Sequence, residues 1–81
     1  MSFEVAARVF LDPLFVSVKE RIQDGEQRWR TFGVVEYIVL LMVAHTAREM
    51  EESGGSFEVM RIISARRATR KERQRYEEEN S

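Results

Sequence analysis

The side chains best suited to chemistry in this chain of 81 residues lie close to its C-terminal end. Residues 61–75 hold seven basic side chains against one acid, Glu72; the basic residues are Arg61, Arg66, Arg67, Arg70, Lys71, Arg73 and Arg75. A guanidinium group makes two charge-assisted hydrogen bonds to one phosphate. A local field of one sign can also steer a polyanion when the whole molecule is nearly neutral. The cluster therefore indicates a phosphate-binding surface, although a solvated helix face gives the same pattern.

Three further side chains could add proton transfer or stacking to such a surface. His45, the single histidine, titrates near neutral pH and could act as an acid or base, or it could be a hydrogen-bonded structural residue of a sheet. Glu72 could act as a base or orient an arginine, but Thr69-Arg70-Lys71-Glu72 also matches a capping box. Tyr76 could stack on a nucleobase or dock its own helix.

Composition excludes several other classes of function. The chain has no cysteine, which excludes a disulfide scaffold, a thiolate metal site and a thiol nucleophile. One histidine and no phosphate-cradling glycine loop argue against a bound metal or cofactor. The longest apolar run, Tyr37–Ala44, is shorter than the ~20 residues of a membrane span. The first four residues show no secretory signal, so we expect a cytoplasmic protein.

The N-terminal part predicts a helix followed by a strand. Ser2 can cap a helix that runs to about Leu11, and Asp12-Pro13 ends it because a residue before proline leaves the helical region. Residues 14–21 are rich in β-branched and aromatic side chains and predict a strand. The Asp-Gly pair within residues 23–26 predicts a turn.

The middle of the chain predicts two more strands. We place one strand at Arg28–Phe32, a turn at Gly33–Glu36 and the next strand at Tyr37–Thr46, because Gly33 is the natural break in a long apolar stretch. Residues 37–44 are apolar at both parities, which fits a central strand covered on both faces. A buried helix is the alternative, since Leu and Met are good helix formers.

The last part predicts a fourth strand and a helix within a single domain of residues 1–81. Residues 47–55 are acidic and end in Gly-Gly, which predicts a flexible hairpin connection. The fourth strand covers residues 56–65, and a helix follows over residues 68–78. In a regular strand Arg61 and Arg66 would lie on opposite faces, so they converge only if the chain turns near Ser64–Ala65.

The C-terminal residues also carry a recognisable signature. The run Ile62-Ile63-Ser64-Ala65-Arg66, continued by Glu72-Arg73 and Tyr76-Glu77, resembles the C-terminal signature of BrnT-type toxins. These proteins are the toxin halves of a bacterial type II toxin–antitoxin system. Similar matches in the same order are Ser2-Phe3-Glu4, Ala6-Ala7, Val9-Phe10, Asp12-Pro13, Val43-Ala44-His45-Thr46 and Arg48.

The resemblance implies a fold, an activity and a partner. The implied fold is α+β and RelE-like, with a four-stranded antiparallel sheet, an N-terminal helix and a C-terminal helix. The implied activity is metal-independent endoribonuclease cleavage that inhibits translation. The implied partner is a BrnA-type antitoxin, whose ribbon-helix-helix part would bind operator DNA for the complex. A small core further suggests a homodimer.

Family members usually begin with a further N-terminal stretch that holds Trp-Asp and Lys-His-Gly elements. This chain begins at Met1-Ser2-Phe3-Glu4, so we expect an exposed sheet edge and fewer basic side chains. One alternative is therefore a catalytically inactive, shortened homologue that acts only as an antitoxin-binding or dimerising module. A generic nucleic-acid-binding domain is a third hypothesis.

The implied reaction assigns roles to the residues named above. Cleavage without a metal uses the 2′-hydroxyl as nucleophile and needs a base, positive charge at the phosphate and an acid for the leaving oxygen. The candidate catalytic residues are His45, Arg48, Arg61, Arg66, Glu72 and Tyr76. The candidate RNA-binding residues are Arg67, Arg70, Lys71 and Arg73.

Overall fold

The computed structural model describes all 81 residues, and its elements confirm the expected α+β fold. Helix α1 covers Phe3–Ala7, and Ser2 caps it by accepting a hydrogen bond of 3.2 Å from the backbone N–H of Val5. A 3₁₀ helix, η1, continues over Arg8–Leu11. It ends at Asp12, whose extended backbone is the conformation favoured before a proline.

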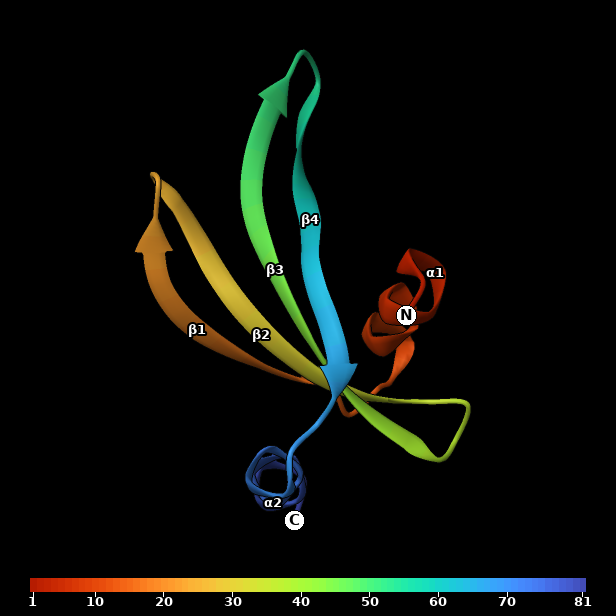
Figure 1. Ribbon diagram of the computed structural model, residues 1–81. Helices are drawn as coiled ribbons and strands as arrows, with labels where there is room; N and C mark the ends of the chain where they lie inside the picture. The colour runs from red at the N-terminus through yellow and green to blue at the C-terminus, as the bar shows by residue number, and fades with distance from the viewer.

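Four antiparallel strands follow in the spatial order β1-β2-β3-β4. Their bounds are Val16–Gln23, Glu26–Val35, Val39–Glu52 and Gly55–Arg67. The β1–β2 turn is the predicted Asp24-Gly25 pair, which supplies positive φ angles of 52° and 79°. Strand β2 pairs with β3 no further than Arg28 opposite Thr46. The β3–β4 hairpin therefore projects beyond β1 and β2 as a two-stranded ribbon (Figure 1).

The predicted turn at Gly33–Glu36 is wrong. Strand β2 continues through Gly33 to Val35, and the turn follows at residues 36–38. Gly33 is needed for close packing, because a Cβ there would lie 2.6 Å from the carbonyl oxygen of Val9 in η1. The glycine lets the N-terminal helix approach the sheet backbone.

The predicted flexible connection over residues 47–55 is also wrong. Strand β3 extends to Glu52, and only Ser53 and Gly54 form the turn, with Gly54 at a φ of 97°. The acidic side chains in this segment lie on the two-stranded ribbon, where both faces meet solvent. A strand whose two faces are both exposed to solvent can be rich in charged residues, and its sequence then resembles that of a loop.

The two faces of the sheet pack against different helical elements. Val9 of η1 and Ala6 of α1 form a core with Val35, Leu41 and Val43 on one face. The other face buries Phe32, Leu40 and Met42, with Ala68 and Tyr76 packed against them. Helix α2, Arg70–Glu79, supplies Tyr76 and lies at one end of the sheet (Figure 1). Residues 40–43 of strand β3 are thus covered on both faces, as predicted for the apolar stretch of residues 37–44.

The α-helices contain five and ten residues, and no helix of the structure has the length and apolar character of a membrane span.

Candidate functional site

A bulge in β4 decides which arginines share a face of the sheet. Ala44 pairs with Ser64, but the next residue of β3, His45, pairs with Ile62, so β4 holds one extra residue. The extra residue shifts the alternation of side chains. Arg61 pairs with Thr46 and Arg66 with Met42, which places both arginines on the α2 face. The shared face therefore arises from this bulge, and the predicted turn near Ser64–Ala65 is wrong. The two side chains do not converge, because Arg61 pairs with Glu26 and only Arg66 lines the groove beside α2.

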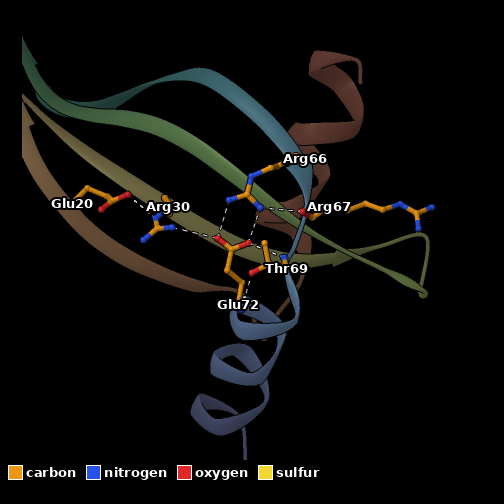
Figure 2. A network of polar contacts seen from close by, with 6 residues as sticks. All are labelled: Glu20, Arg30, Arg66, Arg67, Thr69 and Glu72. Atoms are coloured by element: carbon orange, nitrogen blue, oxygen red, sulfur yellow. Dashed lines mark hydrogen bonds and ion pairs between the residues drawn. The ribbon is translucent and has the colours of Figure 1, made fainter.

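Glu72, in the first turn of α2, is the centre of the site. Its carboxylate accepts hydrogen bonds of 2.7 and 3.1 Å from the two Nη atoms of Arg66. It also accepts one of 3.3 Å from Nη1 of Arg30 on β2. Figure 2 shows Arg30 and Arg66 pointing at this carboxylate from different strands. The Glu72 side chain is 11% exposed, so the ion pair with Arg66 is shielded from solvent on one side.

The start of α2 fixes the position of this carboxylate. The backbone N–H of Thr69 donates to Oε1 of Glu72 at 2.8 Å, and the Thr69 hydroxyl accepts from the backbone N–H of Glu72 at 3.2 Å. The predicted capping box is therefore confirmed. The same glutamate both caps the helix and binds two arginines.

Tyr76 holds the next turn of α2 against the rest of the molecule. Its hydroxyl donates a hydrogen bond of 2.6 Å to Oδ2 of Asp12, which also accepts from the backbone N–H of Val34 at 2.8 Å. Asn80 adds a bond of 3.0 Å from its amide to the carbonyl oxygen of Leu14. These contacts show Tyr76 in the docking role that the sequence left as one of two alternatives.

The electrostatics follow from these contacts. The hydrogen bond from Arg66, opposed by burial, lowers the pKa of Glu72 and raises that of Arg66. Burial first, and then the bond to Asp12, raise the pKa of Tyr76 to about 12. Burial would raise the pKa of Asp12, but the hydrogen bonds from Tyr76, Val34 and Leu14 outweigh it and lower this pKa. Glu72 and Asp12 are thus carboxylates at neutral pH.

A groove of about 770 Å³ lies beside this network, between the sheet and α2. Its charged lining consists of four cations, Arg30, Arg66, Lys71 and Arg75, and three carboxylates, Glu72, Glu78 and Glu79. Val18 and Phe32 form the apolar part of the wall. Within this groove, the guanidinium groups of Arg30 and Arg66 lie around the ionised carboxylate of Glu72. Guanidinium N–H groups of this kind are suitable donors for the oxygens of a phosphodiester.

His45 lies away from this network. It pairs with Trp29 and Ile62, packs edge-on against Phe10 of η1 at a centroid distance of 5.1 Å, and is 3% exposed. Its Nδ1 bonds to the carbonyl oxygen of Thr46 at 3.2 Å and must donate there, so Nε2 accepts from the Thr31 hydroxyl at 2.7 Å. Burial lowers the pKa of His45, although the Thr46 carbonyl and Glu58 oppose this.

The remaining candidates are dispersed. Arg61 forms an ion pair of 3.3 Å with Glu26, and Arg48 contacts the sulfur of Met50. Arg67 pairs with Leu41 and points away from the groove in Figure 2. Arg70 and Arg73 are exposed on α2, and only Lys71 of the four predicted RNA-binding residues lines the groove.

Sequence reasoning missed Arg30. Its Nε forms an ion pair of 2.6 Å with Glu20 on β1, and its Nη1 reaches Glu72. The sequence did contain a signal for it. Arg28 and Arg30 are two positions apart within the predicted strand Arg28–Phe32, which is part of β2, so both side chains lie on the same face of the sheet. Nothing in the sequence, however, linked that strand to α2 in space.

The sequence of this chain matches one known protein family. Residues 1–72 match the family described as "Ribonuclease toxin, BrnT, of type II toxin-antitoxin system". No curated protein matches the chain. The matched residues include Arg30, Arg66 and Glu72, the three members of the ionic network.

Proposed function

The chain belongs to the BrnT family of ribonuclease toxins from type II toxin–antitoxin systems, and from this premise we propose that its groove between the sheet and α2 cleaves RNA. The observation that carries the proposal is the pair of guanidinium groups, from Arg30 and Arg66, that converge on the partly buried carboxylate of Glu72. Two adjacent guanidinium groups can stabilise the extra negative charge that a phosphodiester gains in the transition state.

The arginines can bind a phosphate without losing Glu72. A guanidinium has five N–H donors. Arg66 uses three of them, two on Glu72 and one on the carbonyl oxygen of Arg67. Arg30 uses one, on Glu72, and its Nε forms an ion pair with Glu20. The remaining donors can serve the non-bridging oxygens of the substrate, while Glu72 and Glu20 keep both groups oriented. Arg66 is also half exposed, so a ligand can reach it.

The proposed reaction is an attack of the ribose 2′-oxygen on the adjacent phosphorus. Water takes the 2′-hydroxyl proton while Glu72 holds the two arginines in place, the P–O5′ bond breaks, and the leaving 5′-oxygen takes a proton from Lys71 or water. The products are a 2′,3′-cyclic phosphate and a 5′-hydroxyl. Metal independence is proposed because two arginines already occupy the groove's central carboxylate. His45 takes no part, since its imidazole is buried against η1 and both ring nitrogens are engaged.

The family's type II system implies an antitoxin partner, and we propose that it is of the BrnA type. In this proposal the toxin contacts operator DNA only through the antitoxin, acts in the cytoplasm on RNA and inhibits translation. A homodimer is also proposed, because exposed apolar side chains such as Phe57 and Val59 lie on the ribbon that projects from the sheet.

The test is cleavage of RNA by purified protein in the presence of a chelator, with the new ends identified by mass spectrometry. We expect cyclic phosphate ends from the wild type and a loss of about a hundredfold in rate or more for Arg66→Ala. Arg8→Ala is the matched control, because Arg8 also pairs with a glutamate but lies on η1, away from the groove. Equal rates for both variants, or ends other than cyclic phosphates, would refute the mechanism.

A second candidate function is a binding module without catalysis. It is favoured by one observation, the existing ion pairs of Arg30 and Arg66 with Glu72, which compete with any phosphate. Expression that leaves bacterial growth unchanged, together with capture of the antitoxin, would support this candidate over the nuclease.

A further inference from the structure

A second bulge lies in β1, next to the groove. Lys19 pairs with Trp29 and Ile22 pairs with Gln27, so two residues, Glu20 and Arg21, oppose the single residue Arg28. The Gln27 amide donates to the carbonyl oxygens of Glu20 and Arg28 and so satisfies backbone groups at the irregular site. Such bulges redirect side chains and increase the local twist. Here the bulge brings Arg21 beside Arg28.

This bulge and the one in β4 lie at the same level of the sheet. The β1 bulge is opposite Arg28, and the β4 bulge is opposite His45, which pairs with the neighbouring Trp29. Between them lies a hollow of about 450 Å³, whose lining includes Glu20, Arg21, Arg28, Arg30 and Ala44. Arg30 also lines the groove, so the hollow and the groove share this residue.

The charge in this hollow is not neutralised. Its one carboxylate, Glu20, is already bound to Nε of Arg30. Arg21 and Arg28 form no ion pair within 4.0 Å, and the buried Nε of Arg28 has no hydrogen-bond partner. Two guanidinium groups beside a small alanine therefore face the hollow without an anion of the chain to bind. An unsatisfied buried donor of this kind costs free energy that a bound anion would recover.

We propose that this hollow, with Arg21 and Arg28, binds the phosphodiester backbone of single-stranded RNA next to the bond that is cleaved in the groove. The inference rests on the proposed function, because Arg30 lines both the groove and the hollow, which places the hollow next to the groove along β2. We propose single-stranded RNA because its flexible backbone can follow a positively charged groove, so that successive phosphates contact successive arginines. Arg21 and Arg28 are positioning residues, and they do not touch the reacting atoms.

The test measures binding of an uncleavable probe, a labelled dodecanucleotide RNA with 2′-O-methyl groups throughout. The affinity is determined over a range of salt concentrations for the wild type, for Arg21→Ala and for Arg21→Ala/Arg28→Ala. For single strands the slope of log affinity against log salt becomes shallower by about 0.7 for each phosphate that the protein no longer neutralises. We expect a change of about that size in the single variant, of about twice that size in the double variant, and weaker binding in both.

Lys19→Ala is the matched control. Lys19 is exposed on the same strand but pairs with Trp29 on the other face, so its loss removes one charge without touching the hollow. We expect its salt slope to equal that of the wild type. Urea unfolding checks that each variant is folded. If the double variant Arg21→Ala/Arg28→Ala does not fold, the single variant Arg21→Ala still decides the test, because Arg21 is exposed and its replacement should leave the fold intact.

Failure of this inference is distinct from failure of the nuclease proposal. If the wild type cleaves RNA and both variants keep its salt slope and affinity, the hollow is not an RNA site although the groove is. If the variants keep RNA binding but lose capture of the antitoxin, the hollow binds protein carboxylates and the inference is wrong. A wild type that neither binds the probe nor cleaves RNA overturns both proposals.

Discussion

Replacing Tyr76 by Phe removes a single hydroxyl and tests how α2 is held in place. The ring can keep its packing against Phe32 and Met42, while Asp12 loses its 2.6 Å hydrogen bond and keeps the backbone N–H donors of Val34 and Leu14. A hydrogen bond to a charged group contributes about 1.5–3 kcal/mol. For a domain of this size each kcal/mol lowers the melting temperature by roughly 4–8 °C.

The pH dependence tests the same side chain, because burial first and then Asp12 keep the proton on its hydroxyl. The pKa of Tyr76 is raised from 10.0 to about 12 by burial and by Asp12. Between these values the folded protein keeps the phenolic proton and the unfolded chain loses it, so the free energy of unfolding falls as pH rises. Two pKa units correspond to about 2.7 kcal/mol. This stability is fully present below pH 10 and is lost by about pH 12.

The assay is urea unfolding of the wild type, Tyr76→Phe and Tyr37→Phe across the alkaline range. Subtracting the variant from the wild type cancels the contributions of all groups that the two proteins share. We expect the difference for Tyr76→Phe to be about 1.5–3 kcal/mol at neutral pH and to vanish as pH approaches 12. Tyr37 is fully exposed and serves as the control, with no expected difference. A difference that stays constant from neutral to strongly alkaline pH would refute the assigned contact.

Three further substitutions test other parts of the structure. Gly33→Ala places a Cβ 2.6 Å from the carbonyl oxygen of Val9 and should lower the free energy of unfolding by roughly 1–3 kcal/mol, measured in urea; an unchanged midpoint would contradict the close packing. The lowered pKa of His45 means that the wild type loses stability as pH falls below 6.5, and unfolding curves at several pH values should show that His45→Gln lacks this loss; a parallel loss in the variant would contradict burial of a neutral imidazole. Thr69→Ala removes the cap of α2 and should cost about 1 kcal/mol in thermal unfolding, whereas a neutral effect would contradict the capping box.

Local signals in the sequence predicted the elements whose cause is also local. The Ser2 and Thr69 caps, the Asp24-Gly25 turn and the helix end before Pro13 depend on residues a few positions apart, and all are confirmed. The buried strand over residues 40–43 was recognisable because it is apolar at both parities. These features need no knowledge of distant partners.

Errors arose where a distant partner decides the outcome. Gly33 reads as a break, but in the fold it is the position where η1 lies against β2. The two bulges add one residue each to β1 and β4 and cannot be detected without the neighbouring strand. Alternation alone therefore assigned Arg61 and Arg66 to opposite faces. For His45, the sequence left open a structural role that only its contacts with Thr31 and Phe10 reveal.

The capping box explains why the site residues come from such distant parts of the chain. Oε1 of Glu72 accepts from Thr69 and Arg66, and Oε2 accepts from Arg66 and Arg30, so the carboxylate that starts α2 also fixes the guanidinium groups of β2 and β4. The pKa of Glu72 is lowered by Arg66, so protonation does not release these groups at neutral pH. Because a neutral side chain could still cap the helix but would hold the arginines less strongly, the charge of Glu72 serves the groove, and its position in the first turn serves the fold.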